Sequence, residues 1–383
     1  MVKGFSKFEK VVNEFELSWL RFVILKKIKI LYVIDSLARG GTELQLTGLI
    51  DRLDRRRFTP YLCTLRDVDP VLLPTDCPHL IYKVPRLFSA NGVVSAWRLS
   101  RFLKSDDFTV VQTFFQDATV FGGVAACLAS TPIRLACFRD LGFWRTRAQA
   151  LMQRCVYSMM TGFLANAVCV RDNFSKHGGI KRDAIQVIYN GIDPDSLPWV
   201  EHDGPTLHIG IVGNLNRRVK RTDLFLRAAV QVSRKHPQIT WYVVGDGCYR
   251  SEYEQLACKE GIGDRTVFTG NIECVADYLG KFQVGVLCSD SEGFSNALLE
   301  YMLCGCATVV TRVGGNPEAV IDGQTGLLVP PDNVEALAGA LLKVVEDISL
   351  RRKMAEEARR SVATNFGWNR CVTAHEAIYE NVT

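Results

Sequence analysis

Short runs of apolar, often β-branched residues alternate along this chain with longer segments whose apolar residues recur every three or four positions. Up to about residue 167 the short runs predict strands at 28–35, 60–65, 80–84, 109–114, 133–138 and 163–167. The amphipathic segments between them predict helices at 42–53, 92–104, 117–129, 147–160 and 169–177. Because strands that alternate with helices form a parallel sheet covered on both faces, we predict such a sheet here.

The pattern breaks at residues 192–205, which are rich in Pro, Asp and Gly and poor in core residues, so we place an interdomain linker there. A second series follows, with strands predicted at 207–213, 239–245, 266–268, 284–288, 308–311 and 326–329. Helices are predicted at 221–235, 250–260, 275–282, 296–304, 333–346 and 348–364. The fold class is therefore α/β with two Rossmann-like domains, 28–195 and 206–365. The end of the chain, 366–383, adds a helix without a strand of its own.

Residues 1–27 form an N-terminal extension. Apolar residues recur there at steps of three and four, namely Phe5, Phe8, Val12, Phe15, Trp19 and Phe22, with lysines and arginines around them. This amphipathic pattern fits a helix lying in a membrane interface. It also fits a helix packed on the protein, or a start codon assigned too far upstream.

Composition narrows the class of protein. The 46 basic and 41 acidic residues leave a net charge of +5, which is too small to indicate nucleic-acid binding. No apolar run is long enough for a membrane-spanning helix, and no secretory signal is evident. Thirteen cysteines then indicate reduced thiols in a cytoplasmic protein. The close pair Cys304 and Cys306 has no second pair or nearby His, so we expect no metal site.

Glycine-rich turns indicate phosphate binding of an unusual kind. The chain has no P-loop, and Gly245-Asp246-Gly247 lacks the third glycine of a dinucleotide fingerprint. Gly40-Gly41, however, follows a strand and opens a helix, where free amides bind anions. Gly314-Gly315, followed by Asn316-Pro317-Glu318, forms a second turn of this anion-binding kind. The helix predicted from 296 likewise presents amides 294–296 at the carboxyl edge of the sheet, near the basic run 217–221.

The segment from Glu292 to Glu300 resembles the E-x7-E motif of GT-B glycosyltransferases, specifically the large retaining family 4. Further matching segments are Tyr189-Asn190-Gly191-Ile192-Asp193, Val212-Gly213, Val244-Gly245-Asp246-Gly247, Thr269-Gly270 and Gly326-Leu327-Leu328-Val329. The ordered set spans about residues 28–380. The resemblance implies two facing domains with a central cleft and a C-terminal helix that crosses back to the first domain.

The resemblance also implies roles for individual residues. Glu300 corresponds to the carboxylate that binds the nucleotide ribose, and Glu292 to the one that contacts donor-sugar hydroxyls. Lys220 corresponds to the phosphate-binding lysine. The implied substrate-binding positions further include Gly40, Gly41, Asn214, Gly270, Phe294, Ser295 and Asn296.

Two departures from the family pattern concern catalysis. Where members often carry an Arg after the glycine that opens the second domain, this chain has Asn214, and we expect Arg217 to supply the charge. Where many members carry a His facing the donor sugar, this chain has Arg139 and Asp140. Bacterial exopolysaccharide-type members with a similar Arg-Asp-x-Gly-Phe-Trp stretch resemble it most.

The resemblance implies a retaining, metal-independent hexosyltransferase in cell-surface polysaccharide or glycoconjugate assembly. Its donor would be a nucleotide sugar, UDP- or GDP-linked, and its acceptor a saccharide or a lipid-linked sugar. No cofactor and no nucleic acid are expected, and the protein would act in the cytoplasm, with contact to the inner membrane face. Two alternatives remain at this stage: a GT-B sugar-nucleotide epimerase, and a non-catalytic sugar-nucleotide-binding protein.

Overall fold

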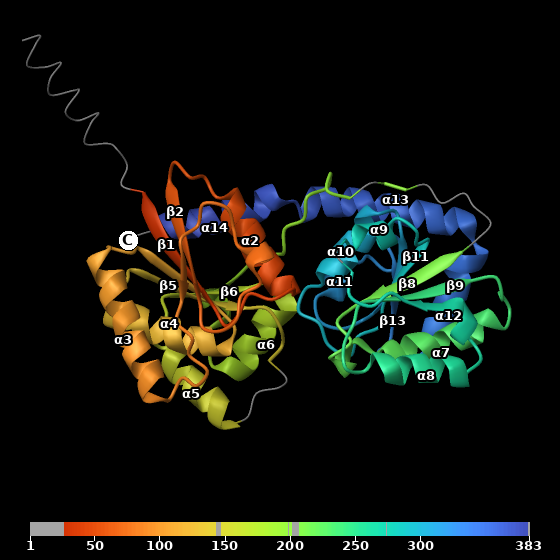
Figure 1. Cartoon of the computed structure of the whole chain (residues 1–383). Coiled ribbons are helices and arrows are strands. Elements are labelled where there is room, and N and C mark those ends of the chain that lie inside the picture. Colours follow the sequence, from red (N-terminus) through yellow and green to blue (C-terminus); the bar gives the residue numbers. More distant parts are fainter. Residues whose placement is uncertain (1–26, 143–146, 198, 201–206, 273, 382–383) are drawn as a thin grey trace, which may run out of the picture.

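In a computed structural model the chain forms two parallel sheets, each covered by helices on both faces (Figure 1). The structure describes residues 27–142, 147–197, 199–200, 207–272 and 274–381. The amphipathic helix predicted before residue 27 lies outside these ranges. This architecture confirms the predicted fold class.

The first sheet has the order β3-β2-β1-β4-β5-β6-β7. Its strands are β1 (Ile28–Ile34), β2 (Phe58–Thr64), β3 (His79–Ile81), β4 (Val110–Phe114), β5 (Ile133–Phe138), β6 (Gly162–Ala165) and β7 (Ile185–Val187). The helices around it are α2 (Gly41–Arg52), α3 (Ala90–Ser105), α4 (Gln116–Leu128), α5 (Arg147–Tyr157) and α6 (Val168–Gly178).

The second sheet has the order β10-β9-β8-β11-β12-β13. Its strands are β8 (His208–Val212), β9 (Thr240–Val244), β10 (Thr266–Phe268), β11 (Val284–Leu287), β12 (Ala307–Thr311) and β13 (Leu327–Val329). Its helices are α7 (Thr222–Ser233), α8 (Arg250–Lys259), α9 (Ala276–Leu279), α10 (Asn296–Leu303), α11 (Asn316–Ala319), α12 (Val334–Glu346) and α13 (Ile348–Asn365).

The strand order places a binding crevice in each sheet. The first strand of each series, β1 or β8, pairs with the second strand on one side and the fourth on the other. In open α/β sheets such a reversal of strand order leaves a crevice at the carboxyl ends of the strands. Residues Ile30–Ile34 of β1 have no exposed surface, as expected for a strand covered on both faces.

Helix α14 (Trp368–Glu380) returns to the first domain, as predicted. The Tyr379 hydroxyl donates to Gln112 Oε1 on β4 at 2.6 Å. The Tyr32 hydroxyl on β1 in turn donates to the Tyr379 hydroxyl at 3.1 Å. The chain crosses between the domains twice, and the two crossings are joined because the Ile192 amide donates to the Phe366 carbonyl at 2.9 Å. The last helix therefore belongs to the core of the first domain.

Several predicted boundaries were wrong in detail. The strand predicted at 80–84 is the shorter β3, and the helix predicted at 275–282 shrinks to the single turn of α9. Strand β7 was not predicted, because its three residues form a short edge strand with the exposed Gln186 in the middle. None of the helices in the described ranges is long and apolar enough to cross a membrane.

Candidate active site

The candidate site begins with an ion pair between two loops of the second domain. Lys220 ends a short 3-10 turn after β8, and its Nζ lies 2.7 Å from Glu292 Oε1. The Ser289 hydroxyl donates to the same oxygen at 2.6 Å. The loops are also joined through the backbone, because the Asp290 amide donates to the Val219 carbonyl at 2.9 Å. Both charged side chains are largely shielded from solvent, so their relative position is well defined.

The N-terminus of α10 follows directly after Glu292. Ser295 occupies the cap position, but its side chain makes no capping hydrogen bond to a described residue. The buried Phe294 ring packs against Tyr189 of the first domain, with ring centroids 5.0 Å apart. The helix start is thereby fixed while its first amides stay available, which is the arrangement that binds anions.

Glu300 lies one helical turn further along α10. Its side chain has no hydrogen-bond or ion-pair partner among the residues that the structure describes. Burial raises the pKa of its carboxyl from 4.5 to about 7, because the charged form is poorly solvated. A half-buried carboxylate whose oxygens have no partner among the described residues has acceptor capacity to offer a ligand's hydroxyl groups.

Asn296 connects this helix start to the first domain. Its Nδ2 donates to the Gly41 carbonyl at 3.0 Å, and its Oδ1 accepts from Asn190 Nδ2 at 2.6 Å and from Gln45 Nε2 at 3.2 Å. A Cβ on Gly41 would lie 3.3 Å from Asn296 Nδ2, so a larger residue would crowd this contact. The glycine turn at Gly40-Gly41 thus meets the α10 N-terminus across the cleft.

Arg139 also lies at this junction, after β5. One of its terminal nitrogens donates to Asn190 Oδ1 at 2.8 Å, and burial lowers the pKa of the guanidinium. Its Nε is buried without a partner among the described residues. A Cβ on Gly293 would overlap the Arg139 carbonyl oxygen, so this glycine permits the close approach of the two domains. Asp140 instead accepts from the Gly142 amide at 2.7 Å within its own turn.

Asn214 and Gly270, which were also predicted to bind substrate, lie in turns that they shape themselves. Asn214 accepts from the Asn216 amide at 2.8 Å and shapes its own exposed turn. Gly270 has a φ of +69° and lies beside the Arg250 side chain, where a Cβ would stand 2.7 Å from a guanidinium nitrogen. The structure thus uses both residues to shape loops. A second anion-binding turn was expected at Gly314-Gly315. The Gly315 amide there already donates to the Gly293 carbonyl at 2.8 Å, so this amide does not point at a ligand.

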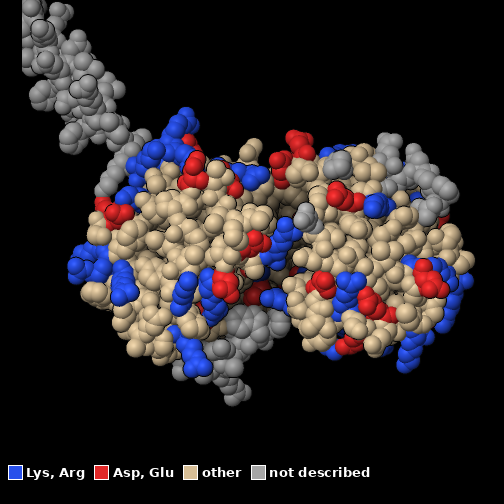
Figure 2. All heavy atoms as spheres, viewed as in Figure 1, with Lys and Arg blue, Asp and Glu red and all other residues tan. Residues whose placement is uncertain are grey.

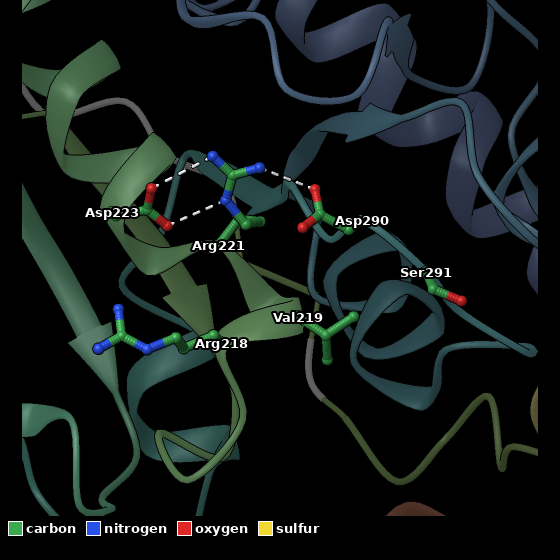
Figure 3. Close-up of a pocket in the computed structure, with 6 residues that line it drawn as sticks. All are labelled: Arg218, Val219, Arg221, Asp223, Asp290 and Ser291. Atoms are coloured by element: carbon green, nitrogen blue, oxygen red, sulfur yellow. Dashed lines mark hydrogen bonds and ion pairs between the residues drawn. The ribbon is translucent and has the colours of Figure 1, made fainter. Parts of the chain in front are cut away.

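The basic side chains of the run 217–221 have different partners and point in different directions. Arg218 makes two hydrogen bonds to Glu252, at 2.9 and 2.7 Å, and Arg221 binds Asp223 and Asp290. Figure 3 shows Arg221 between these two aspartates and Arg218 directed away from them, around a pocket of about 420 Å³. Lys220 points instead toward Glu292, and Arg217 is exposed. Only these last two are available to a ligand in the cleft.

Two acidic residues at the domain junction were missed by the sequence analysis. Glu43, in the first turn of α2, has its pKa raised by burial, while Arg217 and Arg139 oppose that shift. Glu318 reaches from α11 to the N-terminus of α6, where it accepts from the Val168 and Cys169 amides at 2.7 and 2.8 Å. The sequence signal for Glu43 was its place in Gly-Gly-x-Glu at a helix start; Glu318 gave none, because its partner helix is distant in sequence.

The space between the two lobes carries both signs of charge. Figure 2 shows acidic and basic side chains together along the hollow that separates the lobes. Within the described ranges no group of three or more His, Cys, Asp or Glu side chains is arranged to hold a metal ion.

Comparisons with known proteins identify the family of this chain. The family model described as Glycosyltransferase Family 4 matches residues 39–196, and the one described as Glycosyl transferases group 1 matches residues 206–347. N-acetyl-alpha-D-glucosaminyl L-malate synthase of Bacillus anthracis is 34% identical over 166 residues, 43% of each chain. The lipopolysaccharide core biosynthesis mannosyltransferase LpcC of Rhizobium leguminosarum is 30% identical over 51% of this chain and 59% of its own. The chain thus matches about half the length of these curated relatives.

A solved structure is similar over nearly the whole chain. Anabaena Alr3699/HepE in complex with UDP-glucose has a TM-score of 0.79 and 21% identity, and the match covers 93% of this chain and 99% of that one. At this identity the likeness concerns the fold alone.

Proposed function

Because the chain belongs to the GT-B glycosyltransferases of group 1 and family 4, we propose that it transfers a sugar from a nucleotide-sugar donor to an acceptor hydroxyl with retention at the anomeric carbon. One observation carries the proposal: Lys220 and Glu292 meet at the open N-terminus of α10, with the unpaired Glu300 on the same helix. Together they offer a cation, free amides and a carboxylate along one short segment.

Each group suits a different part of the donor. Glu300 would accept hydrogen bonds from the ribose hydroxyls, and Glu292 from hydroxyls of the sugar. The diphosphate would lie between Lys220 and amides 294–296, with Arg217 approaching from the exposed side. A lysine and a helix N-terminus both favour the negative charge that grows on the leaving phosphate.

The reaction would proceed on one face of the sugar. The bond from the anomeric carbon to the phosphate oxygen breaks, and a bond to the acceptor oxygen forms from the side on which the phosphate departs. The acceptor proton passes to the leaving phosphate oxygen. We propose that the reaction is metal-independent, because Lys220 and Arg217 supply the positive charge that a metal ion would otherwise bring.

We further propose a hexose donor linked to UDP or GDP and a role in cell-surface polysaccharide or glycoconjugate assembly. The similarity to a lipopolysaccharide core mannosyltransferase and to a protein solved with UDP-glucose supports both ideas. All thirteen cysteines are free thiols, which supports a cytoplasmic site of action. The acceptor would be a saccharide or a lipid-linked sugar.

The experiment compares Lys220→Ala with the neighbouring Arg218→Ala, which removes a charge that already faces Glu252. Purified proteins receive UDP- and GDP-hexoses with a saccharide acceptor mixture, and nucleoside diphosphate release and the anomer of the product are measured. We expect wild type and Arg218→Ala to turn over and Lys220→Ala to lose at least about 100-fold in kcat, the size found for lost transition-state charge stabilisation. Normal turnover in Lys220→Ala, an inverted anomer, or epimerised donor without transfer would contradict the proposal.

A further inference from the structure

Basic residues cluster in one segment of the first domain, which Asp76, Asp106 and Asp107 flank in the sequence. Residues 77–105 contain five cations and no acidic residue, whereas the whole chain has a net charge of +5, so the rest of the chain sums to zero. The five cations are Lys83, Arg86, Arg98, Arg101 and Lys104. All five are exposed, and none has an ion-pair partner among the described residues. The segment is therefore an unneutralised basic surface.

Large apolar side chains are exposed on the same segment. Phe88 is 78% exposed, Val93 64%, Trp97 56% and Val94 44%. Residues 93, 97 and 101 follow one another at four-residue steps along α3, and the Arg101 guanidinium lies 5.6 Å from the centre of the Trp97 ring. We call Phe88, Val93, Val94, Trp97 and the five cations the α3 surface.

The fold holds this surface in place. The Ser89 side chain caps α3 by accepting from the Gly92 amide at 3.1 Å, and its hydroxyl donates to the Arg86 carbonyl at 2.8 Å. A Cβ on Gly92 would overlap the Leu87 carbonyl oxygen, so the loop before the helix packs closely on its first turn. Phe88 is thus presented outward by a fixed backbone. The opposite face of α3, including Leu99 and Leu103, is buried in the core.

The location leaves the α3 surface accessible. Figure 1 shows α3 on the flank of the first domain that is farthest from the second domain, and basic side chains gather on that flank in Figure 2. Docking there would leave the interdomain cleft open.

We propose that the α3 surface docks the protein on an anionic lipid bilayer. Aromatic and aliphatic side chains that flank long cationic ones match the interface of such a bilayer, where the rings enter the headgroup region and the cations meet lipid phosphates. A nucleic acid would use the cations but leave Val93 and Val94 exposed to water. The proposal goes beyond the proposed function and does not depend on catalytic activity.

The first test uses the full chain and sucrose-loaded vesicles of phosphatidylcholine, with or without about one-third phosphatidylglycerol. We expect co-sedimentation with the anionic vesicles only. The double variant Arg98→Glu and Arg101→Glu should lower the partition coefficient at least about 25-fold, since each basic residue near the surface contributes about fivefold. The control, Arg234→Glu and Lys235→Glu on the second domain, changes net charge equally and should bind like wild type.

A second pair of variants tests the apolar contribution. Trp97→Ser should lower vesicle binding about tenfold, whereas Ile348→Ser, a similarly exposed apolar position on α13, should leave it unchanged. Circular dichroism and melting temperature check that all variants fold. Equal binding by the α3 variants and wild type would overturn the proposal. Self-association that Trp97→Ser abolishes, without vesicle binding, or preferential binding of the surface to DNA would overturn it as well.

Discussion

Replacing Glu300 by Gln should stabilise the unliganded protein, and the gain should depend on pH. Burial raises the pKa of this carboxyl from 4.5 to about 7. Each pKa unit corresponds to about 1.4 kcal/mol, so keeping Glu300 ionised above pH 7 costs up to about 3 kcal/mol of folding free energy. Between pH 4.5 and 7 the folded state binds more protons than the unfolded state. The stabilising effect of this group is therefore fully present below pH 4.5 and is lost as the pH rises through 7.

The assay is urea denaturation of wild type and Glu300→Gln at pH 5 and pH 8. We expect the two proteins to differ little at pH 5 and the variant to be more stable by up to about 3 kcal/mol at pH 8. Glu260→Gln, at an exposed position at the end of α8, serves as the matched control and should change stability little at either pH. A Glu300→Gln protein that is less stable than wild type at pH 8 would refute the reasoning.

The same titration gives a signal for ligand binding. Ribose hydroxyls that donate to the Glu300 carboxylate would favour its ionised form, so binding of UDP at pH 7 should release up to about half a proton. Calorimetry in two buffers of different ionisation enthalpy measures this release directly. Binding without proton release would leave the stability argument intact but remove Glu300 from the ribose.

Two further predictions concern contacts between the domains, and a third concerns the packing of α14 on the first domain. Gly293→Ala should keep nucleotide binding but lose turnover at least about 100-fold, because its Cβ would overlap the Arg139 carbonyl oxygen; titration and kinetics distinguish the two effects. Glu318→Ala should lose about 1–3 kcal/mol in urea denaturation, since two α6 amides lose their acceptor, and Glu318→Gln should recover part of this. Tyr379→Phe should lose about 1–2 kcal/mol in thermal unfolding, because Gln112 Oε1 loses its donor; an unchanged melting temperature would contradict this.

The fold could be predicted because its main signals are local. A strand such as β1, buried on both faces, appears in the sequence as an almost continuous apolar run, and the helices between strands show their periodicity within one segment. Strand β7 and helix α9 are shorter than the windows in which such patterns appear. Their existence depends on the sheet edge and on the core beside them.

The site could be predicted only in part, because only some of its residues lie in one local segment of the sequence. The motif from Glu292 to Glu300 is a local segment, and the structure brings it together with Lys220 as expected. The separate directions of Arg218 and Arg221 depend on Glu252 and Asp290, which lie elsewhere in the chain, so the basic run alone could not reveal them. The contact of Glu318 with α6 likewise joins two domains, and no spacing in the sequence encodes it.

The return of α14 to the first domain has a consequence for synthesis on the ribosome. The first domain leaves the ribosome up to Ile192, yet its core lacks Tyr379 until the second domain has also been synthesised. At about 5–20 residues per second, that interval lasts about 10–40 s. During this time Tyr32 and Gln112 have no partner from α14. The surface of the first domain that α14 later covers is therefore exposed and available to a chaperone. A nonsense mutation between the second domain and α14 would therefore remove part of the core of the first domain, although the two are far apart in the sequence.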